Sequence, residues 1–220
     1  MEFACLGWPP NAPTLRLDYR RFAYAGKFVL GSTGKAVVRD GVGDEEPRSS
    51  ETDREEPRSS ETDREFDDGV LAAASFSADR TDPDRLVVRY VTVRDDRQGE
   101  GLGARLLAFV AGRAAARGYD RVRIAVNNPA AYRAAYRAGF AFTGAETGLA
   151  ELVCERPAAR PATRDVGRYR DGLRRYRERD LDDELAARLD DWLDDPPAVV
   201  DPPPGVDAAG ERVARRDRSE

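Results

Sequence analysis

The chain has 220 residues, of which 40% are hydrophobic and 35% charged, and its net charge is −5 at pH 7. No apolar run approaches the roughly 20 residues that a membrane helix needs, and the start lacks the basic and apolar stretches of a secretory leader. Histidine is absent and cysteine occurs twice, which excludes Ser-His-Asp and Cys-His catalysis, a disulfide framework and a multi-cysteine zinc site. We therefore expect a cytoplasmic protein with no membrane partner and no metal.

The proportions of the charged residue types are unusual. Arginine supplies 34 of the 36 cationic residues, and aspartate outnumbers glutamate by 25 to 16. A Lys-poor, Asp-rich surface suits concentrated salt, where screening shortens the range of self-repulsion, and codon bias towards Arg, Ala, Gly and Asp is an equal explanation. Because phosphate contacts need clustered positive charge, this acidic chain is not expected to bind nucleic acid.

The first 93 residues predict strands around a polar insertion. The strands are expected at residues 15–17, 35–39, 70–76 and 86–93, which are rich in β-branched residues or alternate in polarity. The decapeptide EEPRSSETDR at 45–54 recurs unchanged at 55–64, and residues 43–69 contain almost nothing apolar except Phe66. Such a segment cannot bury enough surface to offset the entropy of ordering it. It therefore predicts a disordered loop enlarged by tandem duplication.

Helices and strands alternate in the next part of the chain. A helix is expected from Leu102 to Arg117, with its apolar residues on one face and Gly118 as a left-handed cap. Asn128 and Pro129 predict the start of a second, short helix. We expect this short helix at 129–138 and strands at 122–126, 140–143 and 149–154. This order predicts a mixed α/β layer arrangement.

The C-terminal part differs in composition. After a linker broken by two prolines, two charged helical segments follow, and the second carries a leucine every four residues, at 181, 185, 189 and 193. This narrow stripe must pack on the main domain or on a second copy of the chain, which would make a homodimer. We therefore divide the chain into a domain at 1–157, a charged helical extension at 158–195 and a disordered tail at 196–220.

A glycine-rich turn joins the strand that ends at Val93 to the helix that follows. Glycines at 99, 101 and 103 remove β-carbons that would keep a phosphate from the backbone. The first-turn N–H groups have no intrahelical partner and can point at an anion, with the helix dipole behind them. A turn without a ligand is the alternative. The spacing fits neither a dinucleotide fingerprint, since Leu106 replaces the third glycine, nor a P-loop, since Ala36 follows Gly34-Lys35.

The spacing that fits is [RQ]-x-x-G-x-[GA], satisfied by Gln98, Gly101 and Gly103. Here the sequence resembles the GNAT superfamily of acyl-CoA-dependent N-acyltransferases. LVVRYVTVRDDRQGEGLGARLLAFV is similar to that family's fourth strand, pyrophosphate loop and third helix, and VRIAVNNPAAYRAAYRAGFAFTG is similar to its fifth strand, fourth helix and the lead into the sixth strand. The resemblance covers residues 86–154, and the chain is similar to members from halophiles. It implies a mixed, mostly antiparallel sheet that splays between strands four and five.

The resemblance also implies acetyl-CoA as acyl donor and assigns its contacts. The backbone of Val91, Thr92 and Val93 would bond the pantetheine arm as though it were an added strand. Asn128 matches a family asparagine near the start of the fourth helix, and a plain helix cap is the equal alternative. The pyrophosphate would be bound at the turn, by Gln98, Gly99, Glu100, Gly101, Leu102, Gly103 and Ala104.

This chain departs from the family pattern at the residue that acts as the acid and protonates the CoA thiolate. Many members carry a tyrosine four residues before the glycine of Gly-Phe, where this chain has Ala135. Tyr136, one residue later, and Tyr132, one turn earlier, are the candidates for catalysis, although one residue is about 100° of helix rotation. Packing of both tyrosines in the core is the alternative.

The general base is assigned only by elimination. Glu146 and Glu151 are the candidates, and solvated surface is the alternative for both. An amine that arrives neutral needs no strong base, because attack on a thioester in a ternary complex is largely a matter of positioning.

We therefore expect an N-acetyltransferase that moves an acetyl group from acetyl-CoA to a small-molecule or peptide amine by direct attack, without a metal. Two alternatives stay open. Ala135 favours a catalytically weak or inactive CoA-binding module that acts in assembly or sensing. The leucine stripe favours an interaction protein whose function lies in that stripe and the disordered arms.

Overall fold

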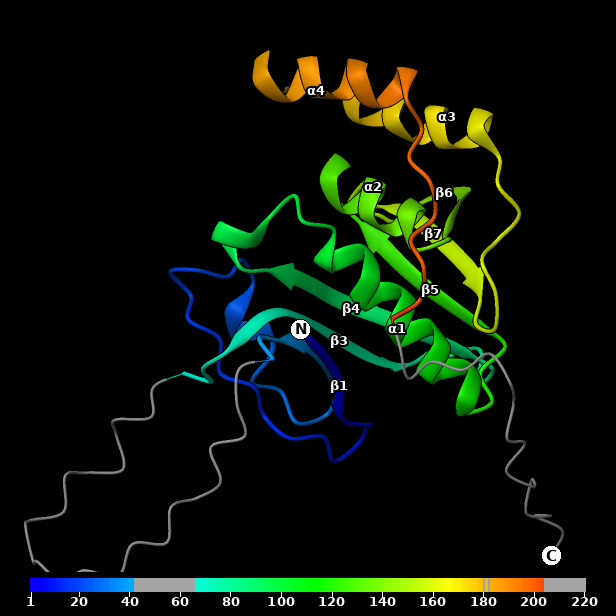
Figure 1. Cartoon of the computed structure of the whole chain (residues 1–220). Helices are drawn as coiled ribbons and strands as arrows, with labels where there is room; N and C mark the ends of the chain where they lie inside the picture. Colours follow the sequence, from blue (N-terminus) through cyan, green and yellow to red (C-terminus); the bar gives the residue numbers. More distant parts are fainter. Residues whose placement is uncertain (42–65, 180, 182, 204–220) are drawn as a thin grey trace, which may run out of the picture.

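The computed structural model describes residues 1–41, 66–179, 181 and 183–203, which form one sheet with helices packed on it (Figure 1). The strands of these ranges are β1 (Glu2–Gly7), β2 (Gly34–Arg39), β3 (Val70–Ala78), β4 (Arg85–Val93), β5 (Arg121–Val126), β6 (Ala141–Glu146) and β7 (Leu152–Pro157). The helices are α1 (Leu102–Ala116), α2 (Pro129–Arg137), α3 (Val166–Arg177) and α4 (Asp183–Asp194), with 3-10 turns η1 (Ala25–Lys27) and η2 (Asp95–Arg97). In the described part of the chain no helix is long and apolar enough to cross a membrane.

The strand order is β1-β2-β3-β4-β5-β7-β6, and every neighbouring pair is antiparallel except β4 and β5. This confirms the predicted α/β fold class. Side chains that alternate along the strands build two cores. Ala36 and Val38 of β2 belong to the core beneath α1 and α2, whereas Val37 belongs to a second core. Residues 7–34, which join β1 to β2, are called the N-terminal segment. Leu15 and Phe28 of this segment cover that second core, on the opposite face of the sheet.

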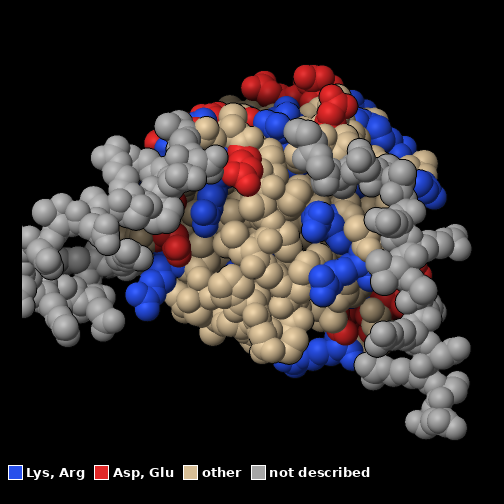
Figure 2. All heavy atoms as spheres, turned by 60° about the horizontal axis from the view of Figure 1, so that its bottom comes forward, with Lys and Arg blue, Asp and Glu red and all other residues tan. Residues whose placement is uncertain are grey.

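The N-terminal segment lies at the lower end of Figure 1. Figure 2 brings this end forward and shows a broad central surface without Lys, Arg, Asp or Glu. Two stretches of the segment, residues 7–15 and 28–34, contain no charged residue. The segment therefore covers its face of the sheet with mostly uncharged side chains.

The parallel pair opens part-way along its length, as the sequence resemblance implied. β4 and β5 pair only from Arg85 to Val88, and the last matched residues are Val88 and Ile124. On the other side of β4, Ser75 lies opposite Tyr90 but Phe76 lies opposite Val88, so Arg89 is the extra residue of a β-bulge. A bulge bends its strand and increases the local twist. β4 then stays with β3 and β5 stays with β7, which confirms the predicted splay.

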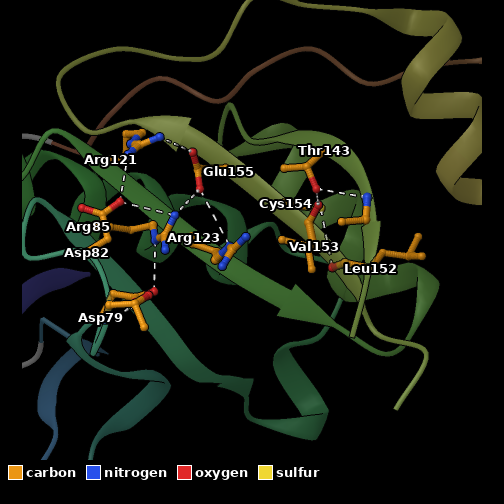
Figure 3. Close-up of polar contacts among 12 residues, drawn as sticks. Asp79, Asp82, Arg85, Arg121, Arg123, Thr143, Leu152, Val153, Cys154 and Glu155 are labelled. Atoms are coloured by element: carbon orange, nitrogen blue, oxygen red, sulfur yellow. Dashed lines mark hydrogen bonds and ion pairs between the residues drawn. The ribbon is translucent and has the colours of Figure 1, made fainter. Parts of the chain in front are cut away.

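Ion pairs lie at the closed end of the splay (Figure 3). Arg85 Nε lies 3.0 Å from Asp79 Oδ2, and Arg121 Nη2 lies 2.8 Å from Asp82 Oδ2. Glu155 of β7 lies 3.6 Å from Arg85 and 3.5 Å from Arg121. Isolated surface pairs contribute little, but a partly shielded network contributes more. This network joins the β3–β4 turn, β4, β5 and β7 at the end opposite the opening.

Replacing Asp79 by asparagine is expected to lower the free energy of unfolding by about 1–3 kcal/mol at pH 7, because it removes charge-assisted hydrogen bonds. The backbone N–H of Thr81, followed by the Thr81 hydroxyl and Arg85, holds the pKa of Asp79 well below its usual range. A lowered carboxyl pKa stabilises the fold above the unfolded pKa of about 3.9, and this stability is lost as pH falls towards the folded pKa.

Urea unfolding at pH 7, 4 and 2.5 tests this expectation. The difference between wild type and Asp79→Asn should narrow below about pH 4, and Asp84→Asn, at an exposed position of the same turn, should have little effect. A difference that stays constant over this pH range would contradict the role given to Asp79.

Some predicted elements are wrong or displaced. Residues 15–17 form no strand, because Leu15 donates its N–H to Phe28 O in the N-terminal segment rather than to a sheet partner (3.1 Å). The edge strand β1 was not predicted. The strand expected at 149–154 begins later, at Leu152, since residues 147–150 form a turn. The duplicated decapeptides and residues 204–220 lie outside the described residues.

The C-terminal helices pack on the main domain. Tyr169, Leu173 and Tyr176 of α3 belong to the same core as α1 and α2. In α4, Leu189 is fully buried in that core and Leu193 packs against it. Of the two arrangements considered for the leucine stripe, the structure therefore has the one on its own domain.

Candidate functional site

The turn before α1 has the backbone that its glycines require. Gly99 has φ +87° and Gly101 has φ +79°, which is the left-handed region that favours glycine. Gly101 is the N-cap of α1 and provides no side-chain cap. Arg97 and Glu100 form a two-bonded ion pair across the turn (2.6 and 2.8 Å), and Gln98 Nε2 donates to Asp95 Oδ1 (2.9 Å). The side chains thus brace the turn while its backbone stays uncovered.

The N–H groups of this turn are free to bind an anion. Within the described residues, those of Gly99 to Ala104 donate to no backbone or side-chain acceptor, and Arg105 is the first to donate, to Gly101 O (3.1 Å). The α1 dipole adds positive potential at the same place. A β-carbon on Gly103 would lie 3.4 Å from Val93 Cγ2. The turn therefore lies directly beside the end of β4, where the splay is open.

Arg137, at the end of α2, adds a positive charge that was not predicted. A β-carbon on Gly101 would lie 3.3 Å from Arg137 Nη2. The Arg137 side chain is half-buried and forms no ion pair or hydrogen bond with another described residue. A guanidinium in this position fits a phosphate oxygen. Its place two residues before Gly139 was visible in the sequence, but its contact with α1 depends on how the two helices pack.

The predicted pantetheine contacts lie along the opening. Val91 and Val93 pack towards the core beneath α1, and Thr92 is buried. Past Val88 this part of β4 has no described partner on the β5 side. Asn128 is the N-cap of α2, where its Oδ1 accepts from Ala131 N (2.8 Å). The helix-cap role of Asn128 is thus observed, and its contact with the cofactor stays a prediction.

The two candidate tyrosines lie between α2 and α3. Tyr132 Oη donates to Tyr169 O (3.1 Å), and burial raises the pKa of Tyr132. The Tyr136 ring stacks on Tyr169 with centroids 4.1 Å apart, and its buried Oη has no hydrogen-bond partner among the described residues. Ala135 is fully buried beside them. No described contact brings either hydroxyl to the opening, so their catalytic roles stay predictions.

The two candidate bases lie on the β6–β7 hairpin. Glu146 Oε1 is 3.8 Å from Arg175 Nε, and Glu151 accepts from Thr147 Oγ1 (3.1 Å). Both carboxylates are therefore occupied by neighbours. Their role as general base also stays a prediction.

A turn with free N–H groups beside a splayed parallel pair is what the resemblance to N-acyltransferases implied. Residues 37–140, slightly less than half of the chain, match the model of the acetyltransferase (GNAT) family. These residues are therefore similar to the GNAT acetyltransferase family. The match includes β4, the glycine turn, α1, β5 and α2, so the matched region contains every element that builds the opening.

Solved structures similar to this chain include nourseothricin acetyltransferase, with 26% sequence identity, a match over 42% of this chain and 61% of that chain, and a TM-score of 0.37. An N-acetyltransferase from Staphylococcus aureus Mu50 has 16% identity over 57% of this chain and 68% of that chain, with a TM-score of 0.40. A Salmonella typhimurium acetyltransferase solved with acetyl-CoA has 17% identity over 60% of this chain and 69% of that chain, with a TM-score of 0.41. The chain thus spans less than two thirds of nourseothricin acetyltransferase. All three TM-scores are below 0.5.

No curated protein matches the sequence. The expected similarity to members from halophiles stays a prediction.

Proposed function

We propose that this protein transfers an acetyl group from acetyl-CoA to a primary amine by direct attack in a ternary complex. The observation that carries the proposal is the row of free N–H groups from Gly99 to Ala104, which adjoins both Arg137 and the open edge of β4. A diphosphate needs such donors at a helix start. A pantetheine arm, with its two amides, needs an unpaired strand edge. The glycine turn offers the donors and β4 offers the unpaired edge, and the two lie next to each other.

The proposed reaction depends mainly on backbone N–H groups and on positioning, and little on side chains. The bound thioester supplies the acetyl group, and free N–H groups of β4 would stabilise the oxyanion that develops on its carbonyl. A neutral amine held against the thioester needs positioning more than a strong base. Of the two tyrosines proposed for protonating the thiolate, Tyr136 is favoured because its hydroxyl has no described hydrogen-bond partner, whereas that of Tyr132 is engaged.

Replacing Tyr136 by phenylalanine is expected to lower kcat by about 100-fold or more, the usual contribution of a general acid. The fold should be unaffected, because the hydroxyl has no described partner to lose. Tyr132→Phe is the matched control. It should lower the free energy of unfolding by about 1 kcal/mol through loss of one hydrogen bond, without lowering kcat. A Tyr136→Phe protein with wild-type kcat would rule Tyr136 out as the acid.

Acetyl-CoA is first titrated into the full chain by calorimetry, and CoA release is then assayed over a panel of amines. We expect binding and turnover on at least one amine. The buried Ala135 at the family's tyrosine position favours a CoA-binding module as the second candidate. Binding without turnover on any amine would support that module. Absence of binding would instead support a protein whose function is interaction.

A further inference from the structure

Two non-glycine residues of the described chain have a left-handed backbone, Tyr24 with φ 59° and Ala150 with φ 57°. Side chains other than glycine rarely adopt this conformation, and when they do, the surrounding structure must hold them there. Tyr24 lies in the N-terminal segment and Ala150 in the β6–β7 turn. Although distant in sequence, both are connected to Asn127, the first residue after β5.

Tyr24 connects the two strands that separate at the opening. Its Oη accepts a hydrogen bond from Asn127 Nδ2 (3.1 Å). Its ring lies against that of Tyr90, with centroids 5.9 Å apart. Tyr90 is the first residue of β4 after the bulge, and Asn127 directly follows the last residue of β5. Tyr24 therefore bridges the gap in which β4 and β5 no longer pair.

The residues around Asn127 are held from the other side by α3 and the turn after it. Arg179 Nη1 donates to Asn127 O (3.2 Å), and Nη2 donates to Ala150 O. Tyr176 Oη donates to Val126 O (2.7 Å), and its ring lies beneath the Arg179 guanidinium. The backbone at residues 126 and 127 is thus held by Tyr176 and Arg179, while the Asn127 side chain donates to Tyr24. Such support is what a binding site needs to hold its geometry.

Tyr24 and the glycine turn lie on opposite faces of the sheet. Tyr90 packs with the core under the N-terminal segment, whereas Val91 and Val93 pack with the core under α1, which the glycine turn precedes. A cofactor bound at the turn would reach the opening from the α1 face. The opposite face is left for the amine, and there Tyr24 is about half exposed (48%).

We propose that Tyr24 and Asn127 form the site that holds the acceptor amine. This inference rests on the acetyltransferase activity proposed above. Asn127 Nδ2 occupies one lone pair of Tyr24 Oη, so the other lone pair can accept an N–H of the amine while the phenol O–H faces solvent. As the N–C bond forms, the C–S bond breaks and its electron pair leaves on the thiolate. The amine proton passes to Tyr24 Oη while the phenol proton passes to water, and the thiolate is protonated separately.

Tyr24→Phe tests this site because it keeps the ring against Tyr90 and removes only the hydroxyl. We expect kcat/KM for the amine to fall at least about tenfold, with the Kd for acetyl-CoA unchanged. Asn127→Ala, which removes the donor to that hydroxyl, should lower kcat/KM in the same direction. Tyr19→Phe is the control, since Tyr19 is an exposed tyrosine of the same segment that packs on Phe66 and has no described contact with Asn127. It should leave both constants unchanged.

The outcomes separate this inference from the proposed function. Wild-type kcat/KM in both Tyr24→Phe and Asn127→Ala would overturn the acceptor site and leave the acetyltransferase standing. A weaker Kd for acetyl-CoA in Tyr24→Phe would also overturn it, because the hydroxyl would then act on the cofactor. A wild-type protein that binds acetyl-CoA but acetylates no amine would overturn the proposed function, and the acceptor site with it.

Discussion

Replacing Gly101 by alanine is expected to raise the Kd for acetyl-CoA at least about tenfold, which corresponds to about 1.4 kcal/mol. Alanine at φ +79° is strained by about 1–2 kcal/mol, so the turn would relax away from this conformation. The added methyl would also lie 3.3 Å from Arg137 Nη2, close enough to displace the guanidinium. Both effects disturb the surface that a diphosphate would contact. Calorimetric titration of the two proteins measures the change.

Gly118→Ala separates this effect from backbone strain in general. Gly118 has φ +88° at the other end of α1 and has open space around it. Its replacement should cost similar backbone strain and lower the free energy of unfolding, but leave the Kd for acetyl-CoA unchanged. Equal affinities for Gly101→Ala and the wild type would mean that the turn is not where the cofactor binds.

Truncating Leu173 to alanine is expected to lower the free energy of unfolding by about 2–5 kcal/mol, the usual range for a leucine in a core. Leu173 is fully buried, in one core with residues of α1, α2 and β6. On this basis we propose that α3 is part of the folding unit, although its composition set it apart as an extension that begins at residue 158. Denaturant unfolding followed by circular dichroism measures the loss.

Val166→Ala, at the exposed first turn of the same helix, is the control and should change the free energy of unfolding little. If Leu173→Ala were as stable as Val166→Ala, α3 would be an appendage, and the boundary near residue 157 would stand. Loss of α3 would also uncover the rings of Tyr132 and Tyr136, which stack on Tyr169. Shortening the chain before residue 166 is therefore expected to give an unstable protein.

Local rules predicted the elements around the site. Gly118 has the left-handed backbone expected of a helix cap, and Asn128 caps α2 through its side chain. These features depend on neighbours within four residues, so the sequence contains all the information they need. The glycine turn was predictable for the same reason, because a left-handed N-cap admits few other residues.

The missed features depend on contacts between distant segments. Leu15 and Leu17 alternate like a strand, but they bury their side chains from an irregular segment that bonds to residue 28. Arg137 lies close to Gly101, which is 36 residues away in the sequence. Tyr24 accepts a hydrogen bond from Asn127, which is 103 residues away. Neither residue belongs to a motif that spacing can reveal. The side chains at the opening therefore required the three-dimensional structure.

The binding of acetyl-CoA at the glycine turn is tested most directly by a titration of the ¹⁵N-labelled protein with acetyl-CoA, followed through the backbone amide signals. If acetyl-CoA binds at the glycine turn, the largest shifts should occur at Gly99 to Ala104, with smaller shifts along Val91 to Val93 at the open edge of β4. Shifts confined to other parts of the chain, with the amides of the glycine turn unmoved at saturation, would contradict it.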